Sequence, residues 1–263
     1  MNSKRLNYPR ALKTLFPEYF TSEKTILATH RGYGKHGPIA ENTLGAFQES
    51  TRRGFKAHEL DVRISLDLKA VLFHGPTLEK TTSGFGRLEK QNMVDLEKLD
   101  WGNYLPKKAK PVKPLLLEEY LKLFANKVFT NIEIKHDWCI FNHNLENTVI
   151  DICKKNWGKG NYIFSSFNLW SLRYLRKALP AAAIGILIDL SPFASLKIAI
   201  GRLFVKPDSI HLHPQLATQK RVLKYKKLGY GILVWGINSS EKLQEMKNLG
   251  VDIVVTDNMD LCK

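Results

Sequence analysis

The chain has 263 residues, 44% of them hydrophobic, which is enough to bury one full core, so we expect a single domain over residues 1–263. Its 40 Lys and Arg residues outnumber its 25 Asp and Glu residues, and the resulting net charge of +15 favours anionic partners and argues against basic ones. No stretch approaches the roughly 20 apolar residues of a membrane span, which argues against a membrane-spanning protein.

Short apolar runs alternate with amphipathic helical patterns, an order that predicts parallel strands joined by helical crossovers. The predicted strands are 25–30, 57–63, 71–74, 128–135, 161–166, 183–188, 209–212, 231–235 and 252–256. The predicted helices are 43–53, 116–126, 145–156, 169–177, 219–227 and 241–249. These elements correspond to eight βα units plus one hairpin return, so the expected fold class is α/β, a (β/α)8 TIM barrel.

Three glycines and one irregular segment refine this order. Gly54, Gly229 and Gly250 each stand between a predicted helix and the next strand, where a left-handed residue commonly ends a helix. Residues 75–114 are rich in Gly, Lys and Pro and contain only a short helical pattern around residues 93–99. We expect this segment to form a small insertion at the C-terminal mouth of the barrel, the end at which the strands finish.

Residues 192–206 are apolar, with Lys197, Arg202 and Lys206 interspersed. We favour an ordinary barrel helix for this segment. The same pattern also fits a helix that rests on an anionic membrane, which would add a peripheral membrane contact and extend the substrates to long-chain lysophospholipids.

Ionisable side chains gather at the ends of four predicted strands, which is where a barrel enzyme builds its site. They are His30, Arg31, Glu59, Asp61, His74, Glu133 and Lys135. Because successive strand residues point to opposite faces, Glu59 and Asp61 project together into the mouth. With Glu133 they form an oxygen-rich pocket without thiolates, which suits Mg²⁺ or Ca²⁺ better than Zn²⁺.

These groups also have ordinary structural interpretations. Paired carboxylates in a strand are commonly ion-paired or solvated at an edge, and a lone histidine such as His30 is commonly hydrogen-bonded in the core. The strand of Glu59 and Asp61 is expected to be interior, however, where unpaired charge is costly. His30 stands between an apolar strand and Arg31-Gly32. Both positions favour a catalytic interpretation.

Short motifs follow one another in a fixed order from about residue 26 to residue 258. They are His30-Arg31-Gly32, Glu41-Asn42-Thr43, Glu59-Leu60-Asp61-Val62, His74, Asn131-Ile132-Glu133-Ile134-Lys135, Ser165-Ser166-Phe167, Trp235-Gly236-Ile237-Asn238, Gly250-Val251-Asp252 and Thr256-Asp257. In these motifs the sequence resembles the glycerophosphodiester phosphodiesterase family. The resemblance implies a barrel hydrolase that splits glycerophosphodiesters into glycerol 3-phosphate and an alcohol.

The resemblance also implies roles for individual residues. Glu59, Asp61 and Glu133 would bind the divalent cation. His30 and His74 would be the acid/base pair, in which we expect His30 to take the proton of the nucleophile. The remaining implied roles are phosphate binding by Arg31 and Lys135, contact with the glycerol side by Asn42 and Trp235, and support of these groups by Glu41 and Phe167.

The sequence departs from the family pattern around His74. Gly75 follows this histidine where the family usually has Asp, so the carboxylate that normally orients the ring is missing. Leu68-Lys69 replaces an Asp-Gly turn, and Lys80 stands where the family usually has Arg. Near the C-terminus, Asp257 fits either a cap of the last helix or a contact with the substrate.

The cysteines indicate the cellular compartment. Cys139, Cys153 and Cys262 are odd in number, far apart and outside any metal-ligand spacing, so we expect free thiols in a reducing compartment. The basic N-terminus is not followed by an apolar run of signal-peptide length. We therefore expect a soluble cytoplasmic protein, at most peripheral to a membrane.

Two rival functions stay open. One is a lysophospholipase D-like lipid phosphodiesterase, which acts on the same bond in a bulkier substrate. The other is a non-catalytic basic module that binds polyanions, for which the net charge of +15 is the motive. The intact set of catalytic residues argues against the second. Nothing in the sequence indicates specific recognition of nucleic acid or sets the oligomeric state.

Overall fold

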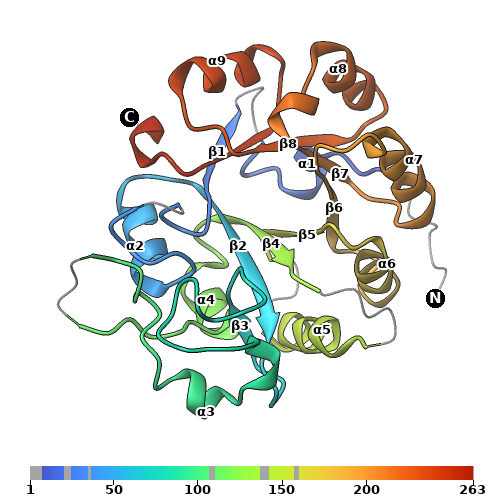
Figure 1. Cartoon of the computed structure of the whole chain (residues 1–263). Helices are drawn as coiled ribbons and strands as arrows, with labels where there is room; N and C mark the ends of the chain where they lie inside the picture. Colours follow the sequence, from blue (N-terminus) through green and yellow to red (C-terminus); the bar gives the residue numbers. More distant parts are fainter. Residues whose placement is uncertain are drawn as a thin grey trace.

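Eight parallel strands close into a barrel in the computed structural model, which describes residues 8–20, 25–34, 37–106, 110–136, 142–156 and 160–262. The strands are β1 (Ile26–Thr29), β2 (Ala57–Ile64), β4 (Phe129–Ile134), β5 (Tyr162–Ser166), β6 (Ala183–Ile188), β7 (Ser209–Leu212), β8 (Gly231–Trp235) and β9 (Ile253–Thr256). Each barrel strand pairs with the next, and β1 pairs with both β2 and β9, which closes the sheet. The predicted (β/α)8 TIM barrel is confirmed (Figure 1).

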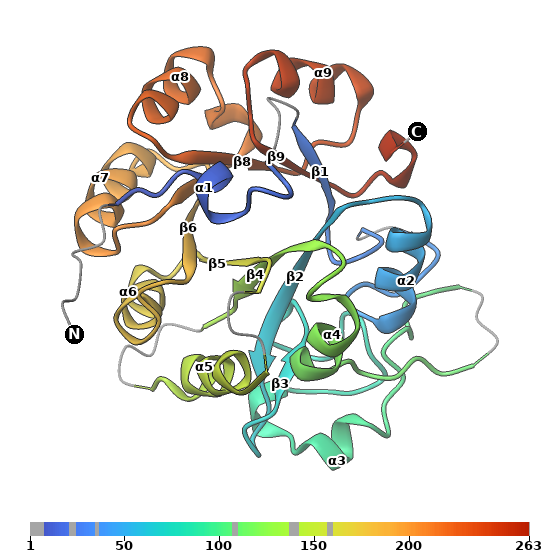
Figure 2. The ribbon, with the colours of Figure 1, turned by 180° about the vertical axis from the view of Figure 1, so that it is seen from behind.

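A ring of helices covers the barrel wall and is seen from opposite sides in Figures 1 and 2. The helices are α2 (Leu44–Arg52), α4 (Leu117–Phe124), α5 (Asn144–Asn156), α6 (Leu169–Ala178), α7 (Ala194–Phe204), α8 (Gln219–Lys227) and α9 (Ser240–Asn248). Gly54, Gly229 and Gly250 adopt the positive φ expected of helix caps. Apolar residues three and four apart direct each helix onto the barrel, as in α4 at Leu117, Tyr120, Leu121 and Phe124.

The strand predicted over residues 71–74 is the hairpin return and is not part of the barrel wall. β2 extends past the mouth to Ile64, and β3 (Ala70–Leu72) runs back along it in the antiparallel direction. The backbone N–H of Phe73 then donates to the carbonyl of Asp61, which brings the next residue, His74, to the mouth. His74 therefore reaches the mouth from the end of the hairpin return and not from the end of a barrel strand.

The insertion packs beside β2 and β3 at the mouth (Figure 1), and its residues 107–109 lie outside the described residues. It contains the 3-10 helix η1 (Leu88–Lys90) and the short helix α3 (Met93–Leu96), and Thr77 forms a β-bridge with Arg87. Its small core consists of Val71, Phe73, Leu78, Leu88, Met93, Leu96 and Trp101. The residues after His74 are thus held in a packed unit.

The opposite end of the barrel is covered by α1 (Leu12–Leu15), which lies across the strands when the molecule is viewed from behind (Figure 2). Leu12 and Phe16 pack among residues at which the strands begin, including Ala57, Phe129 and Ala183. These contacts fill the bottom of the barrel and leave the mouth as its open end.

The described residues bear on two further expectations. Cys153 is a buried free thiol and Cys262 a partly exposed one, whereas Cys139 lies outside the described residues. None of the helices in the described ranges is long and apolar enough to cross a membrane.

A buried carboxylate joins three segments at the bottom of the barrel. Asp208, just before β7, is fully buried. Its carboxylate accepts hydrogen bonds from Nε of Arg10 at 2.9 Å, Nη2 of Arg176 at 2.7 Å and the backbone N–H of Ile184 at 3.0 Å. Loss of its charge would leave two guanidinium groups without their partner, which is costly in a buried position.

We predict that Asp208→Asn lowers the free energy of unfolding by about 3–5 kcal/mol, the usual cost of removing one partner of a buried ion pair. Urea unfolding followed by circular dichroism measures the change. The control is Asp95→Asn, which breaks only an exposed pair with Lys98 and should leave stability almost unchanged. Equal unfolding midpoints for the two variants would contradict the importance of the Asp208 network.

Candidate active site

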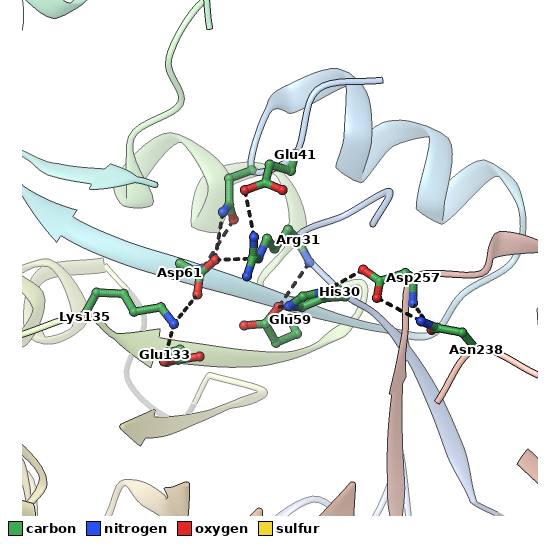
Figure 3. Close-up of polar contacts among 10 residues, drawn as sticks. His30, Arg31, Glu41, Glu59, Asp61, Glu133, Lys135, Asn238 and Asp257 are labelled. Carbon is green, nitrogen blue, oxygen red and sulfur yellow. Dashed lines mark hydrogen bonds and ion pairs between the residues drawn. The ribbon is translucent and has the colours of Figure 1, made fainter. Parts of the chain in front are cut away.

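Three carboxylates converge at the mouth of the barrel. Asp61 of β2 lies opposite Glu133 of β4 in the sheet register, and Glu59 precedes Asp61 by two residues on the same face. One oxygen atom of each side chain lies within 4.8 Å of an oxygen of each of the other two, and all three residues are buried (Figure 3). The structure thus brings together the three residues predicted as cation ligands.

Two positively charged side chains border this carboxylate cluster. Nζ of Lys135 lies 3.0 Å from Oδ1 of Asp61 and also contacts Oε1 of Glu133. Nε of Arg31 lies 3.1 Å from Oδ2 of Asp61, and its Nη1 donates to Oε1 of Glu41 at 2.9 Å. Burial opposes ionisation of Asp61, but the charges of Lys135 and Arg31 outweigh it and lower the pKa of this carboxyl.

Glu59 is the least compensated member of the carboxylate cluster. Burial, followed by the negative charge of Asp61, raises the pKa of Glu59 to about 8. Oε1 of Glu59 has no hydrogen-bond partner among the described residues, and Oδ1 of Asp61 has only the ion pair with Lys135 there. Buried oxygen donors with surplus negative charge are the ligands that hard divalent cations take. The residues therefore fit a hard divalent cation.

We predict that binding of a divalent cation releases a proton near neutral pH. The carboxyl of Glu59 is largely protonated below about pH 8, and a cation requires its ionised form. The dissociation constant for Mg²⁺ should therefore fall about tenfold per pH unit as the pH rises toward about 8. Calorimetry in buffers of different ionisation enthalpy counts the released protons, and Glu59→Gln should bind more weakly and release fewer protons than the wild type. A wild-type dissociation constant independent of pH would contradict this prediction.

His30, which follows β1, is held by residues that follow β8 and β9. Its Nδ1 lies 2.6 Å from Oδ1 of Asp257, and Nδ2 of Asn238 donates to the other oxygen of that carboxylate at 3.1 Å. Nε2 of His30 faces Glu59, at 3.9 Å from Oε2 (Figure 3). Burial lowers the pKa of His30, but the hydrogen bond with Asp257 and the charge of Glu59 outweigh it and raise the pKa overall.

The sequence is compatible with two roles for Asp257, a helix cap or a substrate contact, and in the structure its carboxylate contacts His30. This contact follows from the closure of the barrel, because β9 pairs with β1 and Thr256 lies opposite Thr29. Asp257 and His30 are the residues that directly follow these two threonines. Oδ1 of Asn238 accepts a hydrogen bond from the backbone N–H of Asp257 at 2.8 Å. The amide of Asn238 therefore holds both the backbone and the carboxylate of Asp257.

The turn after β1 directs Arg31 back into the mouth. Arg31 and Gly32 both have positive φ, and a side chain at Gly32 would collide with α2. The backbone N–H of Arg31 donates to Oε2 of Glu59 at 3.1 Å. Asn42, also at positive φ, donates from Nδ2 to Oδ2 of Asp61 at 3.0 Å and accepts the N–H of Asp61 at 3.3 Å. Its amide thus positions Asp61, and its contact with glycerol stays a prediction.

His74 lines a cavity of about 190 Å³ between the mouth and the insertion. No group in the described part of the chain hydrogen-bonds its ring, consistent with Gly75 as the next residue. Burial above all lowers the pKa of His74 to about 3; the negative charge of Asp61 opposes this shift, and the charges of Lys135 and Arg31 add to it. The other lining residues are Arg31, Glu41, Gly75, Thr77, Lys80, Thr81 and Tyr104.

Aromatic side chains lie at the ends of β5 and β8. Trp235 packs edge-on against Phe167, with ring centroids 6.5 Å apart, and against His213 at 5.0 Å. Nε1 of Trp235 is buried and has no hydrogen-bond partner among the described residues. The two predicted aromatic residues therefore contact each other.

Comparison with known proteins identifies similar chains over nearly the whole length. The model of the glycerophosphoryl diester phosphodiesterase family matches residues 30–261. A glycerophosphodiester phosphodiesterase of Caldanaerobacter subterraneus subsp. tengcongensis is 30% identical over 238 residues, which cover 89% of this chain and 95% of that protein. The structure of an Oleispira antarctica phosphodiesterase in complex with the product sn-glycerol-3-phosphate superposes with a TM-score of 0.80 at 26% identity, covering 90% and 95% of the two chains. A glycerophosphodiester phosphodiesterase of Thermotoga maritima superposes with a TM-score of 0.72 at 28% identity, covering 90% and 96%.

Proposed function

Since the chain belongs to the glycerophosphoryl diester phosphodiesterase family, we propose that it hydrolyses glycerophosphodiesters to glycerol 3-phosphate and an alcohol with one divalent cation and two histidines. Its class, a phosphoric diester hydrolase, follows from the family. The observation that carries the proposal is the carboxylate cluster, with His30 facing it and His74 in the cavity that shares Arg31. The Oleispira antarctica relative binds the corresponding product, sn-glycerol-3-phosphate.

The phosphate group of the substrate is assigned to the positively charged part of the mouth. Glu59, Asp61 and Glu133 would hold the cation, Mg²⁺ or Ca²⁺, through oxygen atoms alone. When bound, this ion supplies positive charge for the phosphoryl oxygens, whose negative charge grows in the transition state. Arg31 and Lys135 add charge from the chain itself. Because carboxylates already hold both side chains in place, neither must reorganise during the reaction.

His30 is assigned as the general base. Asp257 holds its Nδ1, so Nε2 is the nitrogen that takes a proton from the nucleophile, which is a water molecule or a hydroxyl group of the substrate. The carboxylate of Asp257 then stabilises the imidazolium ion that forms, in agreement with the raised pKa of His30.

His74 is assigned as the general acid that protonates the leaving oxygen. In the protein without substrate, burial and two nearby cations favour its neutral form. A bound phosphodiester brings negative charge that opposes both cations and favours the protonated form. The substrate itself therefore charges the acid, and this dependence is stronger because Gly75 provides no carboxylate.

The remaining site residues are assigned by their contacts. Glu41 holds the guanidinium group of Arg31, and Asn42 holds Asp61. We assign Trp235 to the glycerol side because its buried Nε1 lacks a partner among the described residues, and Phe167 supports its ring.

We predict that His30→Ala and His74→Ala each lower kcat/KM for glycerophosphocholine by about 10²- to 10⁴-fold, the usual contribution of one acid or base. Asp257→Asn should give a smaller loss, because it removes the charge that stabilises the His30 imidazolium but keeps a polar partner. The control is His143→Ala, since His143 stacks on Tyr174 outside the site. Steady-state assays with Mg²⁺ measure these changes. Turnover of His30→Ala close to wild type would refute the assignment.

We predict that Gly75→Asp raises the pKa of His74 and extends activity to higher pH. A carboxylate next to the ring favours the protonated form, so the alkaline limb of the kcat profile should move upward. A Cβ at Gly75 would lie 3.1 Å from the carbonyl oxygen of Thr77, so either substitution requires that carbonyl to shift by about a few tenths of an ångström. Gly75→Asn is the matched neutral control. If the pH profiles of the two variants coincide, His74 is not the group that limits activity at high pH.

The rival functions receive less support than the proposed one. A non-catalytic basic module has no need of buried carboxylates that face a histidine, and such a cluster is costly to keep. A lysophospholipase D-like activity would use the same groups on a bulkier alcohol. A panel that pairs glycerophosphocholine with lysophosphatidylcholine separates these substrates.

A further inference from the structure

Helix α7 is apolar on the side that faces solvent as well as on the side that faces the barrel. Its inner residues, such as Ile198 and Gly201, pack against the barrel strands. On the outer side, Phe193 and Leu203 are 71% and 82% exposed. An outer barrel helix normally presents charged residues to water, as the neighbouring α8 does with its exposed lysines. Packing against the barrel therefore explains the inner apolar residues of α7 but not the exposed ones.

The exposed apolar residues continue from α7 to the mouth. Gly201 approaches Leu169, and Phe204 contacts the ring of Trp170 at 4.7 Å between centroids, so α7 lies against the first turn of α6. That turn is at the mouth end, because α6 begins just after β5 finishes. We call the resulting surface the α7 face, and its large exposed residues are Trp170, Leu190, Phe193, Leu196, Ile200 and Leu203.

Basic side chains border the α7 face. Lys197 and Arg202 stand on α7 itself, Arg173 of α6 lies over the ring of Phe204 at 5.6 Å, and Nη2 of Arg221 in α8 donates to Oγ of Ser195 at 3.3 Å. Residues 168–228, which include this face, contain eleven Lys and Arg residues and two acidic residues, Asp189 and Asp208. Asp208 is buried and bound by arginines, and Asp189 lies 3.8 Å from Lys197. An apolar centre with a basic border complements the acyl chains and negative headgroups of an anionic bilayer. A symmetric pair of copies would instead place the two basic borders against each other.

We propose that the α7 face rests on the surface of an anionic phospholipid bilayer. Phe193, Leu196 and Leu203 enter the boundary between headgroups and acyl chains, and the surrounding Lys and Arg residues contact anionic headgroups. Phe167 links this surface to the active site, because Lys197 of α7 lies over its ring at 5.0 Å and Trp235 packs edge-on against the same ring. The mouth then opens beside the membrane, where phosphodiesters derived from lipids are released.

Co-sedimentation with phosphatidylcholine vesicles, with and without phosphatidylglycerol, tests the proposal on the whole protein. The wild type should bind the vesicles with phosphatidylglycerol at least tenfold more tightly, and added salt should weaken this binding. The double variant Leu196→Gln, Leu203→Gln should lose about tenfold or more of the affinity. The control is Leu66→Gln with Leu123→Gln, two leucines that are 54% and 41% exposed on the β2–β3 hairpin and on α4, away from this face.

Hydrolysis of soluble glycerophosphocholine shows that every variant is folded, and it should not change in either double variant. This readout also separates a failure of membrane docking from a failure of the proposed enzymatic activity. Vesicle binding that ignores phosphatidylglycerol, or that both double variants reduce equally, would overturn the proposal. So would a wild-type dimer in light scattering that Leu196→Gln with Leu203→Gln converts to a monomer, because the α7 face would then be a subunit interface.

Discussion

Buried negative charge at the mouth is the constraint on which the rest of this structure depends. Three carboxylates whose oxygens lie within 4.8 Å of one another repel strongly in a water-poor site. The ammonium of Lys135 and the guanidinium of Arg31 offset part of this repulsion, and a raised pKa at Glu59 offsets more. The compensation stays incomplete, since Glu59 keeps a buried oxygen without a partner among the described residues. The proposed divalent cation would neutralise this surplus, and the mouth would then attract an anionic phosphodiester.

The closed sheet supplies the positions that the charge cluster needs. Pairing of β2 with β4 fixes Asp61 beside Glu133, and pairing of β9 with β1 joins His30 to Asp257 across 227 positions of sequence. Arg31 adopts a left-handed conformation that is unfavourable for its residue type. It is held there by a backbone hydrogen bond to Glu59, so the charge cluster and the turn stabilise each other.

Much of this architecture follows from periodicity. The two-residue repeat of a strand is sufficient to place Glu59 and Asp61 on one face, and apolar spacing locates the helices of the ring. The contact between His30 and Asp257 cannot be predicted from periodicity, because it depends on which strands meet when the barrel closes. The contact of Asn42 with Asp61 cannot be predicted in this way either, because it requires a left-handed backbone conformation at Asn42 that follows no repeat in the sequence. The direction of β3 is set by its pairing with the end of β2, which a short apolar run does not encode.

His74 stands on a segment outside the barrel wall, so the cavity around it is built from different elements than the carboxylate cluster. The carboxylates and His30 come from strands that cannot shift without disrupting the closed sheet. The cavity around His74 is instead walled by insertion residues such as Thr77, Lys80 and Tyr104, next to a small core of their own. Changes in the insertion would therefore reshape this cavity, and with it the space for the alcohol in the proposed reaction, without moving the carboxylates on the barrel strands.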